Sequence, residues 1–390
     1  MLLNIEEAKI NKKFSLLKTC IIFLLSVAII CIVARYISND DFRSYINRNV
    51  FKSEVEEDSL NSIDIDNNSS VSIYAYDKYI TVLSENELSQ YDDNGVLKSK
   101  TEVNISKPLM DASGKYFVLA EESGKKIYLV SGAEVIWERD LEGEISRVSV
   151  NKNGYVSVVI KNTAYKSKVI VFDNQGTDLF TVFLSKNYAI CTALSDNNKY
   201  LAIGEVSYSG TILKSGVNIY SVEKAVQDPK HAVINSYTVN NGELVLGISY
   251  HGSDNAICRF DSHVQKVTKD SNERLYDVSQ NDLFVDTNLD SEAAIINRAS
   301  SGMFTYEYQI NFKETTGKSE RMYILNQDVP SFIVAKENTL AVSFGHEVEF
   351  INTSGWLKKK YISNGTVNSL VLGDHVAGVI YKNKIVVIKI

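Results

Sequence analysis

Cysteine, histidine and tryptophan are scarce in this chain of 390 residues, which has four, five and two of them. Two of the cysteines, Cys20 and Cys31, lie in an apolar run near the amino terminus, so only Cys191 and Cys258 remain as a possible pair. A single pair excludes a disulfide-rich scaffold. Both remaining cysteines lie in alternating, strand-like stretches, which favours two buried thiols over a bridge.

The histidines have neither metal-ligand spacing nor a neighbouring cysteine, and we expect them in loops or on the surface. They are His231, His251, His263, His346 and His375. The segment Asp64–Asn68 alternates carboxylates but lacks the glycine and distal glutamate of a calcium loop. Nucleophile elbows and phosphate-binding glycine loops are missing from the sequence. We therefore predict no catalytic residue, no cofactor-binding residue and no metal ligand.

Basic charge is also in short supply. The chain has 41 basic and 48 acidic residues, and the first 35 residues hold five of the basic and two of the acidic ones, so the remainder carries a formal charge of about −10. An acidic body disfavours nucleic acid and anionic lipid as partners, because both require basic stripes.

The sequence does contain one long apolar run, Thr19 to Ala34. As a helix it spans about 24 Å, and its flanks extend it toward the bilayer core of about 30 Å, with the Lys18 ammonium reaching the headgroups. We predict a transmembrane helix over residues 19–37. More lysines precede the run than arginines follow it, so the positive-inside rule places the amino terminus in the cytoplasm and the rest outside a cell membrane.

A cleaved signal peptide is the competing interpretation of the run. It requires a small-x-small site after the apolar core, and Ile32-Val33-Ala34 is a poor one. A lipoprotein requires a small residue before the acylated cysteine, but Ile30 precedes Cys31. These observations favour an uncleaved, single-pass anchor.

Four segments follow from this pattern. Residues 1–18 are a short cytoplasmic segment, 19–37 the transmembrane helix, 38–70 a polar stalk or linker, and 71–390 an extracytoplasmic domain. The stretch Ser62 to Asp66 alternates well enough to be a strand. After Ser70 the chain reads as short strands separated by Gly, Asn, Asp and Ser turns, with no convincing helix.

Two turn patterns recur in the strand-rich part, at intervals of roughly forty residues. One has a polar turn followed by an aromatic or apolar strand start, and the other has a four-residue turn ending in glycine. The first occurs at residues 110–117, 150–156 and 194–201, and the second at 91–97, 172–176 and 351–357. Alternating hairpins of this kind predict four-stranded antiparallel blades, with one hairpin joining inner strands and the other joining outer strands.

On these turns the body resembles a β-propeller of the WD40-like and quinoprotein-like repeat group, in a degenerate form without the histidine and tryptophan-aspartate signature. The whole layout also looks like a family of membrane-anchored propellers from low-GC Gram-positive bacteria, which implies no activity. The expected fold is all-β, with seven or eight four-stranded blades after the single helix. Units are expected to begin near Val71, Ser106, Ile145, Tyr188, Ser236, Leu275, Ser331 and Val367.

The last unit has only three strands, ending with Lys384 to Ile390, so the early strand near Ser62 is expected to complete it and close the ring. Tyrosines that alternate within strands, such as Tyr74 and Tyr76, are expected to pack between blades. A quinoprotein cofactor requires a tryptophan in the central funnel, whereas Trp137 and Trp356 both follow hairpin turns at outer strands. A redox cofactor is therefore disfavoured.

The sequence thus favours a non-enzymatic interaction or envelope scaffold module, held in the membrane through Thr19 to Ile37. An envelope protein or a cell-wall polymer is the expected partner. The alternative is a propeller-type hydrolase or lyase that acts on cell-wall glycans through channel carboxylates. Its candidate residues are Asp111, Asp196 and Asp374, which turn chemistry already explains.

Overall fold

The computed structural model describes residues 2–38, 42, 46, 50–51, 53–66, 71–84, 86–161, 164–209, 212–239, 242–300, 306–325 and 329–390. The chain divides into two compact units, residues 1–55 and 56–390. The first contains α1 (Leu2–Ser38), whose segment Ile21–Ser38 is long and apolar enough to cross a membrane. Its side chains are exposed, as at Ile22 and Phe23, which excludes the core helix of a soluble domain.

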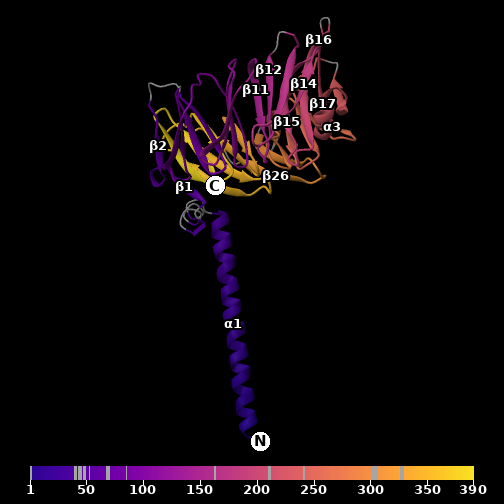
Figure 1. Ribbon diagram of the computed structural model, residues 1–390. Coiled ribbons are helices and arrows are strands. Elements are labelled where there is room, and N and C mark those ends of the chain that lie inside the picture. The colour runs from indigo at the N-terminus through magenta and orange to yellow at the C-terminus, as the bar shows by residue number, and fades with distance from the viewer. Residues whose placement is uncertain are drawn as a thin grey trace. The chain divides into compact units, whose positions relative to one another are not determined.

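The described residues of the second unit form eight antiparallel sheets, each built on four strands (Figure 1). A short strand, β1 (Glu54–Glu56), joins one of these sheets as a fifth strand, and the 3-10 helix η2 (Glu57–Ser59) follows it in the chain. The first four sheets are β3 (Ser72–Tyr76), β4 (Tyr79–Leu83), β5 (Glu87–Tyr91) and β6 (Leu97–Glu102); β7 (Pro108–Ser113), β8 (Tyr116–Glu121), β9 (Lys126–Ser131) and β10 (Glu134–Asp140); β11 (Glu144–Val150), β12 (Val156–Lys161), β13 (Ser167–Phe172) and β14 (Asp178–Leu184); and β15 (Tyr188–Leu194), β16 (Tyr200–Ser209), β17 (Ile212–Ser221) and β18 (Val233–Val239).

The other four sheets complete the series. They are β19 (Val245–His251), β20 (Asn255–Phe260), β21 (His263–Val267) and β22 (Asn272–Asp277); β23 (Asp282–Asp286), β24 (Glu292–Ser300), β25 (Tyr306–Glu314) and β26 (Glu320–Leu325); β27 (Phe332–Lys336), β28 (Thr339–Ser343), β29 (Glu347–Asn352) and β30 (Leu357–Ile362); and β31 (Ser369–Leu372), β32 (Val376–Ile380), β33 (Lys384–Lys389) and β2 (Ser62–Asp64). Eight such blades in sequence order form a β-propeller, which confirms the predicted fold class.

The recurring turns occupy the predicted places in the blades. The first pattern joins the innermost strand to the second, as between β11 and β12, where Gly154 adopts a φ of +80°. The second joins the third strand to the outermost, as between β5 and β6, where Gly95 adopts a φ of +73°. There the Asp92 carboxylate accepts backbone hydrogen bonds from Asn94 and Val96 at 2.9 and 3.0 Å. Local turn chemistry therefore sets the meander of each blade.

The ring is closed by strands from opposite ends of the domain. Ile63 of β2 pairs with Ile385 of β33, and Asp64 pairs with Lys384. The expected closure by an early strand is confirmed. The closing strand comes from within residues 38–70, the segment predicted as a stalk.

Two of the predicted blade starts are wrong. Ser236 lies in β18 and Leu275 lies in β22, the outermost strands of the fourth and fifth blades. The fourth blade is longer than the repeat, because β16 and β17 have ten residues each and a short helix, α3 (Val222–Gln227), follows with the 3-10 helix η3 (Pro229–His231). This inserted helix also corrects the expectation of a body without helices.

The core lies between neighbouring blades. Tyr76 of the first blade is fully buried and stacks on Phe117 of the second, with ring centroids 5.0 Å apart, and Tyr74 contacts the same ring. These tyrosines pack between blades, as predicted. Cys191 and Cys258 are both free thiols in the core cluster between the fourth and fifth blades.

Candidate functional site

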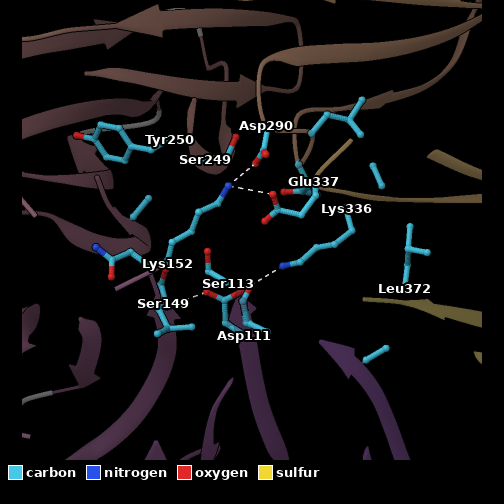
Figure 2. Close-up of a pocket in the computed structure, with 18 of the residues that line it drawn as sticks. Asp111, Ser113, Ser149, Lys152, Ser249, Tyr250, Asp290, Lys336, Glu337 and Leu372 are labelled. Atoms are coloured by element: carbon cyan, nitrogen blue, oxygen red, sulfur yellow. Dashed lines mark hydrogen bonds and ion pairs between the residues drawn. The ribbon is translucent and has the colours of Figure 1, made fainter. Parts of the chain in front are cut away.

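A polar cavity of about 450 Å³ lies where the innermost strands of the eight blades converge (Figure 2). Its lining comes from β3, β7, β11, β15, β19, β27 and β31 and from the loop after β23, so every blade contributes. A central channel of this kind is the usual consequence of ring closure in propellers. Six acidic and basic side chains line its wall: Asp111, Lys152, Asp196, Asp290, Lys336 and Glu337.

Lys152 is positioned by the turn that joins β11 to β12. The Asn151 side-chain oxygen accepts hydrogen bonds from the backbone amides of Asn153 and Tyr155, both at 3.0 Å. The Asn151 amide group donates to the backbone oxygen of Ser195 in the next blade at 2.8 Å. This buried asparagine therefore fixes the turn to its neighbour, and Lys152 follows it directly in the chain.

The Lys152 ammonium connects two other blades across the channel. It lies 2.8 Å from the carboxylate of Asp290 and 2.9 Å from that of Glu337 (Figure 2). Burial opposes a charge on Lys152, but its hydrogen bonds with the two carboxylates outweigh burial and raise its pKa. One cation therefore holds together the third, sixth and seventh blades.

Asp290 and Glu337 share a proton across this contact. Burial raises the pKa of Glu337 to about 7, and a hydrogen bond to Asp290 contributes in the same direction. Burial acts on Asp290 too, but hydrogen bonds from Glu337 and Lys152 outweigh it and lower the pKa of Asp290. Glu337 is therefore the member of the pair that keeps its proton to higher pH, and Asp290 ionises first, because two adjacent carboxylates with one cation do not both ionise freely.

The backbone around Glu337 is also unusual. Glu337 has a φ of +52°, although it is not glycine, and lies at the turn between β27 and β28. Its backbone oxygen accepts a hydrogen bond of 2.8 Å from the amide of Asp290. Left-handed backbone at a non-glycine residue costs of order 1 kcal/mol and is concentrated at functional sites.

A second group of channel residues surrounds Lys336. The Lys336 ammonium donates to the backbone oxygen of Ala112, and the neighbouring Asp111 carboxylate accepts a 2.9 Å hydrogen bond from the amide of Val150. Burial raises the pKa of Asp111, while the positive charge of Lys336 acts against that shift. Figure 2 shows Lys336 reaching across the channel toward Asp111 from the opposite wall.

His251 contacts the backbone of the loop that carries Asp290. Its side chain is fully buried, with Nε2 2.9 Å from the backbone oxygen of Thr287 and Nδ1 2.7 Å from the Thr315 hydroxyl. Burial lowers its pKa to about 4, so the imidazole is neutral at pH 7. The expectation that all five histidines lie in loops or on the surface is wrong for His251 and His263, which are both buried in blade five.

The three carboxylates proposed from the sequence take different positions. Asp111 and Asp196 line the cavity, whereas Asp374 lies at the turn between β31 and β32. Burial raises the pKa of Asp374, and Asp77 acts in the same direction. The sequence analysis missed Lys152, Asp290, Lys336 and Glu337; the available signal was that Lys152 and Glu337 occupy turns after innermost strands, which point toward the channel.

The chemistry open to the cavity follows from these charges. In the part of the chain that the structure describes, no group of three His, Cys, Asp or Glu side chains is placed to hold a metal ion. Asp290 and Glu337 bind the same ammonium group and each other, whereas retaining glycosidases hold their two carboxyl groups about 5 Å apart with the substrate between them. Neither Trp137 nor Trp356 is among the lining residues. Ion pairing and proton sharing are the main properties of this site.

Comparisons with known proteins agree with this fold. A profile described as "Family of unknown function (DUF5711)" matches residues 51–390. No curated protein is a significant match in sequence. The crystal structure of BamB from Moraxella catarrhalis is similar, with a TM-score of 0.50, 12% identity, and 85% of this chain and 97% of that chain covered. Apo AztD from Citrobacter koseri has a TM-score of 0.47 and 10% identity, with 76% and 87% covered. At these identities the likeness is one of fold alone.

Proposed function

We propose that this chain, which belongs to the family of unknown function DUF5711, is a single-pass membrane protein whose extracytoplasmic propeller is a non-enzymatic interaction module. The observation that carries the proposal is the combination of an exposed apolar helix with a closed, rigid ring. The apolar side chains of Ile21–Ser38, such as Ile22 and Phe23, are exposed in the described structure, and a bilayer would cover them. The propeller then presents loop-built faces to a partner.

The proposed orientation places residues 1–18 in the cytoplasm and the propeller outside, where an envelope protein or a cell-wall polymer is the partner. Lysine and arginine counts on the two sides of the helix support this direction. A cleaved leader is the competing outcome. Sequencing the amino terminus of the mature protein and extracting membranes with alkaline carbonate distinguish the two, because an anchored chain keeps Met1 to Ser38 and stays in the pellet.

Orientation is tested in intact cells with two reporter chains, each of which carries one introduced cysteine. A membrane-impermeant maleimide is expected to label Glu134→Cys, which is exposed on β10, and not Lys9→Cys. The unmodified chain is the control for labelling of the native cysteines, of which Cys258 is buried, Cys191 is half-buried, and Cys20 and Cys31 lie within the proposed span. Labelling of Lys9→Cys alone would reverse the orientation.

The interaction role is tested by photo-crosslinking from exposed positions. Trp356, which is 72% exposed beside the outer strand β30, and Tyr208, which is 75% exposed on the β16–β17 hairpin, report on different parts of the propeller. Capture of a specific envelope chain or glycan from one of them supports the module. A crosslinker at the buried Val158 is the matched control, and equal recovery from all three positions would contradict a specific surface.

A second candidate function is a hydrolase or lyase that acts on cell-wall glycans. The observation that favours it is the pair of Glu337 and Asp290 in a cavity, in which the pKa of Glu337 is raised to about 7 and that of Asp290 is lowered. Pairs with separated pKa values are typical of acid–base sites. Incubation with purified wall glycan should then release fragments that Glu337→Gln does not release, and an inactive native protein would exclude this role.

A further inference from the structure

Five lysines gather at one edge of the third and fourth blades. Lys161 ends β12, Lys166 precedes β13, Lys186 lies between β14 and β15, Lys168 is on β13, and Lys214 is on β17. Successive strands of a blade run in opposite directions, so the connections that carry these lysines lie on one face of the disc. The turns that hold Lys152 and Glu337 lie on the opposite face. We call this set the lysine face.

The lysines of this face form no ion pairs among the described residues. No described carboxylate lies within 4.0 Å of any of the five ammonium groups, and all five side chains are exposed except the half-buried Lys168. Glu144 begins β11 at the same edge but forms no ion pair with them. The negative net charge of the body, which by itself disfavours an anionic partner, is therefore unevenly distributed.

Aromatic rings lie among these lysines. Tyr165 and Phe183 contact each other with ring centroids 4.8 Å apart, and they are 39% and 50% exposed. The Lys168 ammonium lies 5.9 Å from the centre of the Phe183 ring, and the Lys166 ammonium 5.1 Å from that of Tyr188. Two of the five lysines thus lie against partly exposed aromatic rings.

The neighbouring hairpin adds an apolar tip. β16 and β17 have ten residues each, and their end projects from the blades in Figure 1. Near the tip, Tyr208 is 75% exposed and Ile212 is 53% exposed, with Tyr208 opposite Leu213 in the ladder. Tyr208 and Ile212 therefore leave more than half of their surface exposed near the end of this hairpin.

We propose that the lysine face docks on an anionic phospholipid surface, with Tyr208 and Ile212 entering the interface between headgroups and acyl chains. This proposal rests on the membrane tether of the proposed function. The cations match lipid phosphates, and the apolar tip matches the acyl boundary. A folded protein partner fits less well because lysine is depleted from protein–protein interfaces, and a hydrated polymer offers no apolar layer to Tyr208 and Ile212.

The tether makes a modest surface affinity sufficient. Residues between Ser38 and Glu56 reach at most roughly 60 Å when fully extended, so the propeller never leaves the neighbourhood of the bilayer. Because the helix already holds the chain at the membrane, docking of the lysine face is an intramolecular step, with an effective concentration of order millimolar. Each lysine near an anionic surface contributes roughly a fivefold gain.

The test uses the full chain in nanodiscs with brominated acyl chains, which quench tryptophan at the membrane interface. Tyr208→Trp adds a tryptophan reporter near the tip. Its fluorescence is obtained by subtracting the emission of the native chain, which contains Trp137 and Trp356, from that of the variant. With 30% phosphatidylglycerol in phosphatidylcholine we expect strong quenching of the reporter, and with phosphatidylcholine alone at least a fivefold smaller effect. The double change Lys166→Glu and Lys186→Glu should remove most of the quenching.

The matched control is Lys115→Glu with Lys199→Glu, which changes the same charge on the opposite face and should leave quenching unaltered. Equal quenching in neutral and anionic discs, or none in either, overturns the proposal. If soluble polyphosphate, added to the anionic discs, binds the lysine face and abolishes the quenching, the ligand of this face is a hydrated polyanion and the lipid proposal is wrong. If carbonate instead releases the chain from membranes, the tether is wrong, whereas a retained chain without quenching refutes only the docking.

Discussion

Glu57, which precedes the closing strand β2, forms a 2.6 Å ion pair with Lys384, the first residue of β33. The Glu57 carboxylate, on a side chain only 8% exposed, also accepts hydrogen bonds from the Asn364 amide at 2.9 Å and the Tyr381 hydroxyl at 3.2 Å. Glu57, which leads the chain into the ring, is thus fastened to the eighth blade and to the connection between the seventh and eighth blades. Ring closure depends on this contact as well as on the β2–β33 ladder.

Replacing Glu57 with alanine should lower the free energy of unfolding by about 1 to 3 kcal/mol, because it leaves the partners of a buried carboxylate unsatisfied. Denaturant unfolding of the native and variant chains measures the difference. Glu134→Ala, on the exposed outer strand β10, is the control and should change stability by less than about 0.5 kcal/mol. Equal effects of the two changes would show that Glu57 does not secure the closure.

Acid should weaken the same contact. Burial acts to raise the pKa of Glu57, but hydrogen bonds from Lys384 and Asn364 outweigh it and hold the pKa below its ordinary value of 4.5. A depressed pKa means that the stabilisation is fully present above pH 4.5 and is lost as pH falls below it. The native chain should therefore lose more stability than Glu57→Gln between pH 5 and pH 3, as followed by thermal melts.

Removal of the last strand should unfold the ring. Deleting Lys384–Ile390 takes away four buried side chains, Ile385 to Ile388, leaves β2 without its ladder partner and uncovers one edge of β32. We expect loss of cooperative unfolding, measured by circular dichroism. Ile63→Ala is the milder test of the same closure and should cost about 2 to 4 kcal/mol, since Ile63 is 3% exposed. An unchanged melting temperature after the deletion contradicts closure.

The channel should have the opposite pH dependence. The pKa of Glu337 is raised to about 7, so the folded protein binds a proton that the unfolded chain releases near pH 4.5. Its contribution is present below pH 4.5 and is lost as pH rises toward 7. Glu337→Gln should reduce this fall in stability by roughly 1 to 3 kcal/mol between pH 5 and 8. Glu134→Gln is the control, and an identical pH profile of native and Glu337→Gln chains would contradict the shared proton.

Two turn glycines provide a matched packing test. Both Gly154 and Gly114 have positive φ, at +80° and +53°, but a Cβ at Gly154 would lie 2.7 Å from the Tyr116 ring, whereas at Gly114 it meets nothing within 4 Å. Gly154→Ala should therefore destabilise by about 1 to 3 kcal/mol more than Gly114→Ala, because only the former adds a clash to the backbone strain. Equal melting temperatures would show that Tyr116 moves aside freely.

Local patterns were sufficient where the physics is local. The turn at Asp92 could be predicted because an Asx side chain and a glycine at positive φ act within five residues. The starts of the fifth and sixth blades could not, because the insertion around Val222 changed the repeat length, and nothing local signals where a lengthened blade ends. The buried state of His251 escaped notice for a related reason, since its partners Thr287 and Thr315 lie in the next blade.

The sequence by itself determined the apolar span, the meander of strands and the need for an early strand to close the ring, because hydrophobic runs, alternation and turn residues act over short distances. Only the tertiary structure decided that there are eight blades, that Lys152 meets Asp290 and Glu337, and that lysines gather on one face. Lys152 and Glu337 are 185 residues apart in the chain. Their contact exists because a closed ring brings the innermost strand of every blade to one axis. Hydrophobic alternation and turn residues in the sequence do not show which side chains meet at that axis.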